Sequence, residues 1–200
     1  MSETNAPPLA RPSWSEAIEA VGPAWLLVAI RSRLSTQLQN RLDAEDILQE
    51  VLVASWQAWA GLVWRGARAF RSYLLEIADH RIRDAAEHLD TWKRGGRVQT
   101  VALPEGAPAE ELRASTTPGR IAILRELADC MQAALLLVPE ELREVVRLRV
   151  FEELPMHEVA TRLGIGVSAA KHRFRKGAEI YQRQLRKQLS GRQTPSTARS

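Results

Sequence analysis

The sequence lacks the features of a secreted or membrane protein. Its single cysteine, Cys130, cannot form an internal disulfide, and the apolar run around it favours a buried, inert thiol. No apolar run approaches the roughly eighteen residues that a membrane span needs. Residues 1–12 lack the basic start and long apolar core of a signal peptide. We therefore expect a cytoplasmic protein.

Residue sets for catalysis are missing as well. The histidines have no metal-ligand spacing with Cys130, and His157-Glu158 does not continue to a second histidine where a zinc-binding helix would need one. There is no glycine-rich phosphate loop and no combination of nucleophile, base and orienting residue. The sequence therefore predicts a protein that is not an enzyme and that uses no metal or cofactor.

Strand patterns are absent too, and long segments have helical spacing. The sequence predicts an all-α fold of two small helical bundles joined by a flexible linker, with a helix-turn-helix in the C-terminal bundle. The expected organisation is a disordered N-terminus at 1–12, a bundle at 13–94, a linker at 95–120, a bundle at 121–189 and a disordered tail at 190–200. Glycine and proline define the linker, at Gly95, Gly96, Pro104, Gly106, Pro108, Pro118 and Gly119.

Capping residues predict where the helices begin. Ser13 and Glu16 have the spacing of a capping box, and Pro23 suits the first position of a helix that runs to Gln39. Asp43 is an N-cap for a helix to about Ala60. A third long helix is expected from about residue 70 to residue 89. The C-terminal bundle is expected to contain helices at about 121–137, 140–151, 156–163 and 167–188.

Positive charge is concentrated at the C-terminal end. The whole chain has a formal net charge of +4, but nine Lys or Arg residues and one acid, Glu179, lie between Lys171 and Ser200, which gives this segment +8. The rest of the chain is therefore slightly acidic. This distribution favours contact between the C-terminal segment and nucleic acid.

Residues 154–178 have the pattern of a helix-turn-helix. Gly164 follows an amphipathic helix, and in the next helix small and apolar side chains lie opposite a row of cations. An ordinary amphipathic helix with a solvated basic face would show the same charges, but the preceding helix and turn favour a recognition helix in the major groove. The candidate DNA contacts are Lys171, His172, Arg173, Arg175 and Lys176.

The helix expected from Asp43 to Ala60 has an unusual outer face. Opposite its core side chains lie acids and amides together with a valine and a tryptophan, and tryptophan is favoured at protein interfaces. The alternative is that Trp56 packs under the preceding helix or the linker, and the pattern leaves both open. The residues of this face are Asp46, Gln49, Glu50, Val53 and Trp56.

Both segments resemble one known family. The string VPEELREVVRLRVFEELPMHEVATRLGIGVSAAKHRFRKGAEIYQRQL resembles the fourth conserved region of the extracytoplasmic-function (ECF) group of bacterial sigma factors. It differs from the usual pattern at Pro155, Gly166 and Ala169. The string DAEDILQEVLVASWQAW resembles the second conserved region of the same group. The resemblance implies a dissociable RNA polymerase subunit, in which the outer face described above binds the clamp of the largest polymerase subunit and the helix-turn-helix binds the −35 promoter element.

The segment FRSYLLEIADHRIRDAAEHL is similar to the family helix that binds and opens the −10 promoter element. Unpaired bases stack on aromatic rings, and the DNA backbone attracts cations. The candidates are Trp64, Arg65, Arg68, Arg71, Tyr73, His80 and Arg83. The alternative for Tyr73 is a place in the core, with Trp64 covering it. Tyr73 and His80 also stand where the family usually has Trp and Asn.

Two other classes of function remain as rivals. A stand-alone helix-turn-helix regulator would use the N-terminal bundle as an interaction module and bind a palindromic site without polymerase. A protein that sequesters polymerase or a sigma subunit would tolerate loss of the basic helix. The partners expected for the sigma factor are core RNA polymerase and double- and single-stranded promoter DNA, with no membrane. By resemblance, either an anti-sigma factor or control of expression would restrain it.

Overall fold

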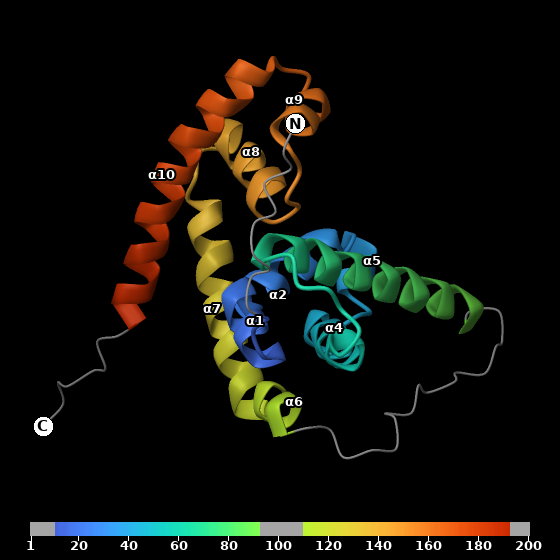
Figure 1. Cartoon of the computed structure of the whole chain (residues 1–200). Coiled ribbons are helices and arrows are strands. Elements are labelled where there is room, and N and C mark those ends of the chain that lie inside the picture. Colours follow the sequence, from blue (N-terminus) through green and yellow to red (C-terminus); the bar gives the residue numbers. More distant parts are fainter. Residues whose placement is uncertain (1–10, 93–109, 193–200) are drawn as a thin grey trace, which may run out of the picture.

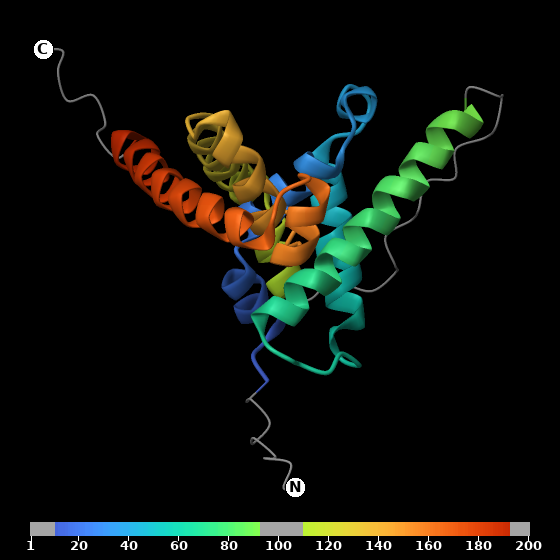
Figure 2. The same cartoon turned by 90° about the horizontal axis from the view of Figure 1, so that it is seen from above.

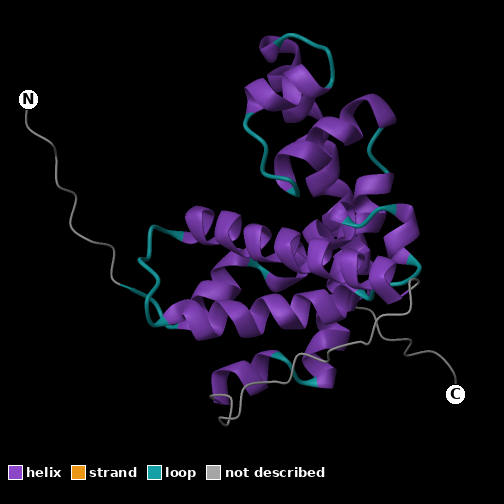
Figure 3. Cartoon of the chain, turned by 90° about the vertical axis from the view of Figure 1, so that its right-hand side faces the viewer, coloured by secondary structure: helices purple, strands orange, loops and turns teal. Residues whose placement is uncertain are grey.

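A computed structural model describes residues 11–92 and 110–192, and in these ranges it contains helices and no strand (Figure 3). The all-α prediction is confirmed. No helix in the described ranges is both long and apolar enough to cross a bilayer. The helices are α1 (Trp14–Val21), α2 (Pro23–Arg33), α3 (Thr36–Gln39), α4 (Ala44–Trp59), α5 (Ala67–Trp92), α6 (Glu110–Ser115), α7 (Pro118–Leu136), α8 (Glu140–Val150), α9 (Met156–Arg162) and α10 (Val167–Arg192).

The predicted helix starts in the N-terminal bundle are confirmed. Ser13 and Glu16 form both hydrogen bonds of a capping box at α1. Gly22, at φ 83°, separates α1 from α2, and Pro23 is the first residue of α2. The Asp43 carboxylate accepts a hydrogen bond from the Glu45 backbone N–H at 3.0 Å and caps α4.

The prediction of one continuous helix from Pro23 to Gln39 is wrong. Leu34 has extended backbone angles, and Ser35 caps the separate short helix α3 by accepting a hydrogen bond from the Leu38 N–H. A serine hydroxyl competes well for the free N–H groups at a helix start, so it favours a new helix over continuation of the old one. Burial of Leu34 fixes the bend between α2 and α3.

Helix α2 is the centre of the molecule. Every residue from Pro23 to Ile30 is buried. An apolar surface on all sides suits a helix that is surrounded, and α1, α4, α5 and α7 all pack against α2. This central position explains why α2 has no polar face of its own.

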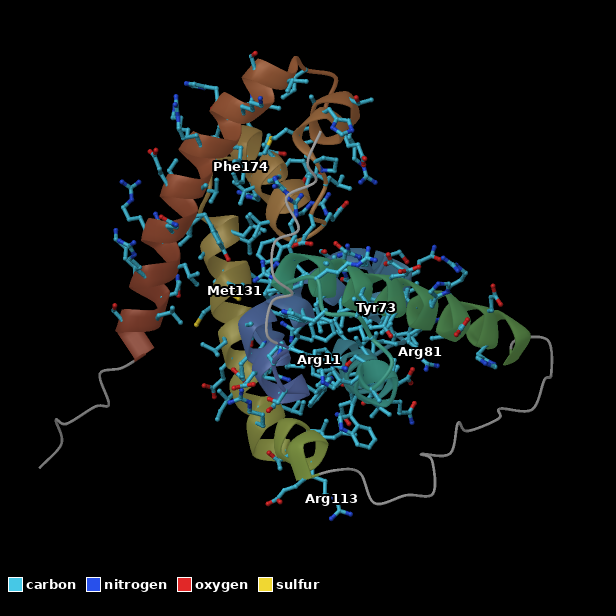
Figure 4. All side chains as sticks on the ribbon, viewed as in Figure 1. Arg11, Tyr73, Arg81, Arg113, Met131 and Phe174 are labelled. Carbon is cyan, nitrogen blue, oxygen red and sulfur yellow. The ribbon has the colours of Figure 1, made fainter. Side chains whose placement is uncertain are left out.

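The C-terminal bundle consists of α7 to α10. Val145, Leu148 and Val159 form a small core, and Phe174 packs against it from α10 (Figure 4). Gly177 allows α10 to approach α8, because a Cβ at this position would lie 2.7 Å from a Val146 methyl carbon. Cys130 is buried, as its apolar surroundings predicted.

The two bundles pack against each other. Helix α7 lies between α10 and the N-terminal helices (Figures 1 and 2), and the loop between α8 and α9 reaches α5, where Glu153 lies 3.8 Å from Arg71. A single cluster of buried side chains includes members of both bundles, from Leu26 and Leu48 to Val146 and Phe151. In the segment that was predicted as linker, residues 110–115 form α6, whose buried Leu112 joins the same core. In the described part of the chain, the larger core therefore spans both bundles, and the small core of Val145, Leu148 and Val159 lies beside it.

Candidate nucleic-acid interface

The helix-turn-helix is formed by α9, a tight turn and α10. Gly164 has φ 63°, where glycine is favoured, and the Ile165 N–H donates to the carbonyl of Ala160 at 3.0 Å. Pro155 precedes α9 without a side-chain cap, and its carbonyl accepts from the Val159 N–H at 3.0 Å. The turn predicted from the sequence is therefore present even though α9 begins without a side-chain cap.

The basic face of α10 is open to solvent. Lys171, His172, Arg175 and Lys176 are exposed, and Arg173 is half-buried. Ala170 and Gly177 are buried on the opposite side, against the rest of the bundle. The structure thus brings all five predicted side chains onto one helix segment. Because successive residues are about 100° apart, the centre of the face lies near His172, and Lys171 and Arg175 lie to one side of it.

Sequence reasoning missed one candidate on this helix. Ser168 is exposed in the first turn of α10. In helix-turn-helix proteins, residues at the N-terminus of the recognition helix contact base edges, and a hydroxyl can donate or accept. The signal that could have found Ser168 is its position directly after the turn. Charge alone does not reveal it.

An ion-pair network holds the helix-turn-helix together. Arg147 of α8 contacts Glu144 at 2.6 Å and also pairs with Glu152, which in turn accepts from Arg162 of α9 at 2.8 Å. The hydrogen bond from Arg147 holds the pKa of Glu144 below its usual value. Glu152 thus connects α8 to α9 and fixes the position of the turn.

The five candidates on α4 differ in exposure. Asp46 and Glu50 are exposed, and Glu50 lies 3.7 Å from Arg81 of α5. Gln49 is half-buried. Val53 and Trp56 are also half-buried and pack against the core. The structure places all five on one side of α4, and the two apolar members also have a packing role.

Sequence reasoning missed Glu45 in the same helix. It is buried, and its Oε1 lies 2.7 Å from Arg31 of α2 and 2.9 Å from Arg125 of α7. Burial alone would raise the pKa of Glu45, but hydrogen bonds with Asp43, Arg125 and Arg31 lower it to about 2. Glu45 is therefore an ionised carboxylate at the junction of the two bundles.

Aromatic side chains cluster where the loop after α4 meets α5. The ring centroids of Trp59 and Phe70 are 5.3 Å apart, and that of Trp64 lies 6.0 Å from Trp59 and 5.8 Å from Phe70. Tyr73 stacks on Phe70 at 6.2 Å and lies near the start of α5 (Figure 4). Trp64 and Tyr73 are half-buried. Part of each ring packs against its neighbours and part stays accessible, so Trp64 and Tyr73 can both pack in the protein and stack on a base.

The cationic −10 candidates do not form a single cluster. Arg65, Arg68, His80 and Arg83 are exposed, and the last two lie 3.4 Å apart. Arg71 faces inward: it donates to the Val21 carbonyl at 2.7 Å, and its guanidinium lies 4.6 Å from the centre of the Trp25 ring. The structure therefore separates Arg71 from the exposed cations of α5.

Comparison with protein families matches both bundles. Residues 24–91 match the model for sigma-70 region 2, and residues 128–179 match a model for sigma-70 region 4. The first range contains the candidate residues of α4 and α5, and the second contains the helix-turn-helix with its basic face.

Curated relatives point the same way. The ECF RNA polymerase sigma factor SigD of Mycobacterium tuberculosis is 30% identical over 161 residues, which are 79% of this chain and 71% of the relative. SigE of Mycolicibacterium smegmatis, also an ECF sigma factor, is 31% identical over 184 residues, 90% of this chain and 65% of the relative. The RNA polymerase sigma-H factor of Pseudomonas aeruginosa is 27% identical over 150 residues.

Proposed function

The chain belongs to the ECF RNA polymerase sigma factors, and from this membership we propose how its surfaces divide the work of promoter recognition. It is a dissociable sigma factor that directs RNA polymerase to promoters and so allows transcription to begin. We place it in the cytoplasm with the polymerase, which supplies the catalysis. A separate anti-sigma factor is a further partner in this proposal.

The exposed basic face of α10 is the proposed −35 contact. Lys171 and Arg175 contact base edges, while Arg173 on the flank contacts phosphate. The observation that supports this most is the arrangement itself: five candidate side chains follow a glycine turn on one helix, whose opposite side is buried against α8 and α9. The neutral ring of His172 offers one donor, so it suits either kind of contact.

The surface of α5 and the loop before it is the proposed −10 contact. Trp64 and Tyr73 offer partly accessible rings for stacking. The exposed cations Arg65, Arg68 and Arg83, together with His80, attract the strand backbone. Arg71 belongs to this set by its position in the matching segment, although its side chain contacts Val21 and Trp25 within the N-terminal bundle.

The outer side of α4 is the proposed contact with the clamp of the largest polymerase subunit, through Asp46, Gln49, Glu50, Val53 and Trp56. The test is the double variant Asp46→Ala/Gln49→Ala, titrated as labelled protein against core polymerase. Truncation of residues central to an interface costs about 2 kcal/mol or more, a loss of affinity of about thirtyfold.

The matched control removes an acid and an amide elsewhere. Asp84 and Gln182 are exposed on α5 and α10, so Asp84→Ala/Gln182→Ala should leave the affinity unchanged. Circular dichroism checks folding of both variants, and binding to an isolated promoter fragment checks the DNA surfaces. Equal polymerase affinity of wild type and the Asp46/Gln49 variant would remove the α4 assignment.

A further inference from the structure

The first turn of α10 is exposed, small and uncharged. Val167, Ser168 and Ala169 are all exposed, and burial begins at Ala170. Gly166 precedes the helix: its carbonyl accepts from the Ala170 N–H at 2.9 Å, and an added Cβ would meet no atom within 4 Å. The turn contains no acid, although a carboxylate would interact favourably with this end of the helix dipole. The composition of this turn therefore does not follow from helix stability.

Val167 is the large apolar side chain of this turn. It is 41% exposed, whereas Leu163 before it and Phe174 after it pack against the small core of the bundle. A β-branched valine in a helix has one strongly preferred rotamer, so both methyl groups of Val167 point in a fixed direction. An exposed apolar side chain gains free energy when a partner covers it. Val167 thus presents a rigid apolar surface to solvent.

Val167 lies one helical turn before Lys171, a proposed base contact. Side chains four residues apart are neighbours on a helix surface, with Cβ atoms about 6 Å apart. Successive base pairs of B-DNA are about 3.4 Å apart along the axis. A base that touches Val167 therefore lies within about two base pairs of the base that touches Lys171. The start of α10 is also on the side of the C-terminal bundle that points away from the N-terminal bundle, where DNA can reach it (Figure 1).

One group in the major groove is apolar, and it is the group that a valine can recognise. The other groups on the base edges need hydrogen-bond donors or acceptors, which the valine side chain lacks. Phosphate prefers cations and donors, so it is a poor partner as well. The C5 methyl group of thymine, in contrast, is recognised by apolar contact. The chemistry and position of Val167 therefore fit a thymine methyl group.

We propose that Val167 determines part of the promoter specificity: it reads a thymine of the −35 element through the C5 methyl group, within about two base pairs of the base that Lys171 contacts. The inference rests on the proposed −35 role of α10 and extends it. Lys171 and Arg175 are hydrogen-bond donors, which suit the acceptors of guanine. Val167 adds a readout of thymine that these donors do not supply.

Removal of one methyl group from the DNA tests the contact. Deoxyuridine has the pairing edge of thymine without the C5 methyl group, so it replaces each thymine of the −35 element in turn. The probe is a labelled promoter fragment, chosen by transcription with core polymerase, and the binding protein is the holoenzyme formed from this chain and core polymerase. We expect one deoxyuridine to weaken binding of the wild type about fourfold, because burial of one methyl group is worth about that factor.

Removal of the methyl groups from the protein completes the cycle. In Val167→Ala the same deoxyuridine should change the affinity by less than about twofold, the range for substitutions that share no contact. Val167→Ile keeps a β-branched apolar side chain and should retain the fourfold effect. Ile123→Ala removes an exposed β-branched side chain from α7 and is the matched control, which should retain it as well. The slope of log affinity against log salt should be the same for all these proteins, because no charge changes.

A purely structural role of Val167 predicts a different result. Alanine has a higher helix propensity than valine, so Val167→Ala should fold, and circular dichroism with thermal unfolding checks this. If Val167 only stabilised the bundle, its loss would lower the thermal midpoint and weaken binding to the thymine and deoxyuridine probes by the same factor. Equal effects of deoxyuridine on the wild type and on Val167→Ala would overturn the thymine contact.

Two further variants separate this proposal from the −35 assignment of α10. If Lys171→Ala and Arg175→Ala bind the promoter fragment as the wild type does, the −35 assignment fails, and the thymine contact fails with it. If they weaken binding, and Lys171→Ala relaxes the choice of base at one position, the assignment stands. In that case, a deoxyuridine effect that depends on Val167 within about two base pairs of that position supports the thymine contact, and the absence of such an effect refutes it.

Discussion

The two bundles differ in how far apart their candidate residues lie in the chain. In the C-terminal bundle, the proposed −35 contacts lie between Lys171 and Lys176 on one helix, and four of the five are exposed. In the N-terminal bundle, the candidates are distributed over α4, the following loop and α5, and several also pack in the core. A site on one helix follows from helical periodicity, whereas a site built from several elements depends on how those elements dock.

The bundles also differ in whether their buried polar side chains have hydrogen-bond partners. In the N-terminal bundle, the buried Trp14 indole N–H donates to the Ser55 hydroxyl at 3.1 Å, and that hydroxyl donates to the Leu52 carbonyl at 2.9 Å. In the C-terminal bundle, the buried Tyr181 hydroxyl has no hydrogen-bond partner in the described part of the chain, and burial raises the pKa of Tyr181 to about 12. The first arrangement is more sensitive to truncation, because a partner would be left unsatisfied.

Phe151→Ala should have the largest effect and tests whether the two bundles are one unit. Phe151 is fully buried, and its ring meets Tyr181 edge to face at 6.2 Å. Removal of a buried phenylalanine side chain costs about 3–5 kcal/mol of unfolding free energy. Urea unfolding measures the loss, and hydrogen exchange locates it. Since the core is shared, α2 should lose protection together with α8. Loss confined to residues 118–192 would show that the bundles unfold independently.

Substitutions on α10 should affect DNA binding by about 1–3 kcal/mol each. Lys171→Ala and Arg175→Ala should weaken binding to the preferred −35 element and relax the choice of base at one position each. Arg173→Ala should weaken binding to all sequences alike and reduce the slope of log affinity against log salt by about one. Competition titrations at several salt concentrations distinguish the two classes. Unaltered transcription and sequence preference of the Lys171/Arg175 double variant at physiological salt would refute the −35 assignment.

Ser55→Ala should destabilise the N-terminal bundle by about 1–3 kcal/mol, because the Trp14 indole N–H would stay buried without an acceptor. Trp14→Phe and the double variant complete a thermodynamic cycle measured by urea unfolding. The cost of Ser55→Ala should be smaller when Trp14 is already phenylalanine. Equal costs in both backgrounds would show that this hydrogen bond does not contribute to stability.

Tyr181→Phe should have the smallest effect. The hydroxyl has no hydrogen-bond partner among residues 11–92 and 110–192, so its removal should change the unfolding free energy by less than about 0.5 kcal/mol or raise it. The edge-to-face contact with Phe151 does not need the hydroxyl. Thermal unfolding of this variant beside Ser55→Ala compares the two bundles directly. A loss as large as that of Ser55→Ala would contradict the difference drawn between them.

The sequence by itself determined the local features of this protein. Hydroxyl, carboxylate, proline and glycine positions have short-range effects on the backbone, so Ser13, Pro23, Asp43 and Gly164 predicted helix starts and a turn that the structure confirms. Residue spacing likewise predicted the exposed basic face of α10. The break at Leu34 was missed, although Ser35 offered a local signal for it.

Only the tertiary structure decided how distant segments combine. Nothing in the spacing around Glu45 or Arg71 indicates that the first pairs with Arg125 or that the second lies beside Glu153, because these partners are 80 or more residues away. The sequence predicted a linker where the structure has α6, for a similar reason. A short helix such as α6 is stabilised by burial of Leu112 against other elements rather than by its own propensity. Docking of the bundles depends on the fit between two folded surfaces, and that fit is specified only when both surfaces exist.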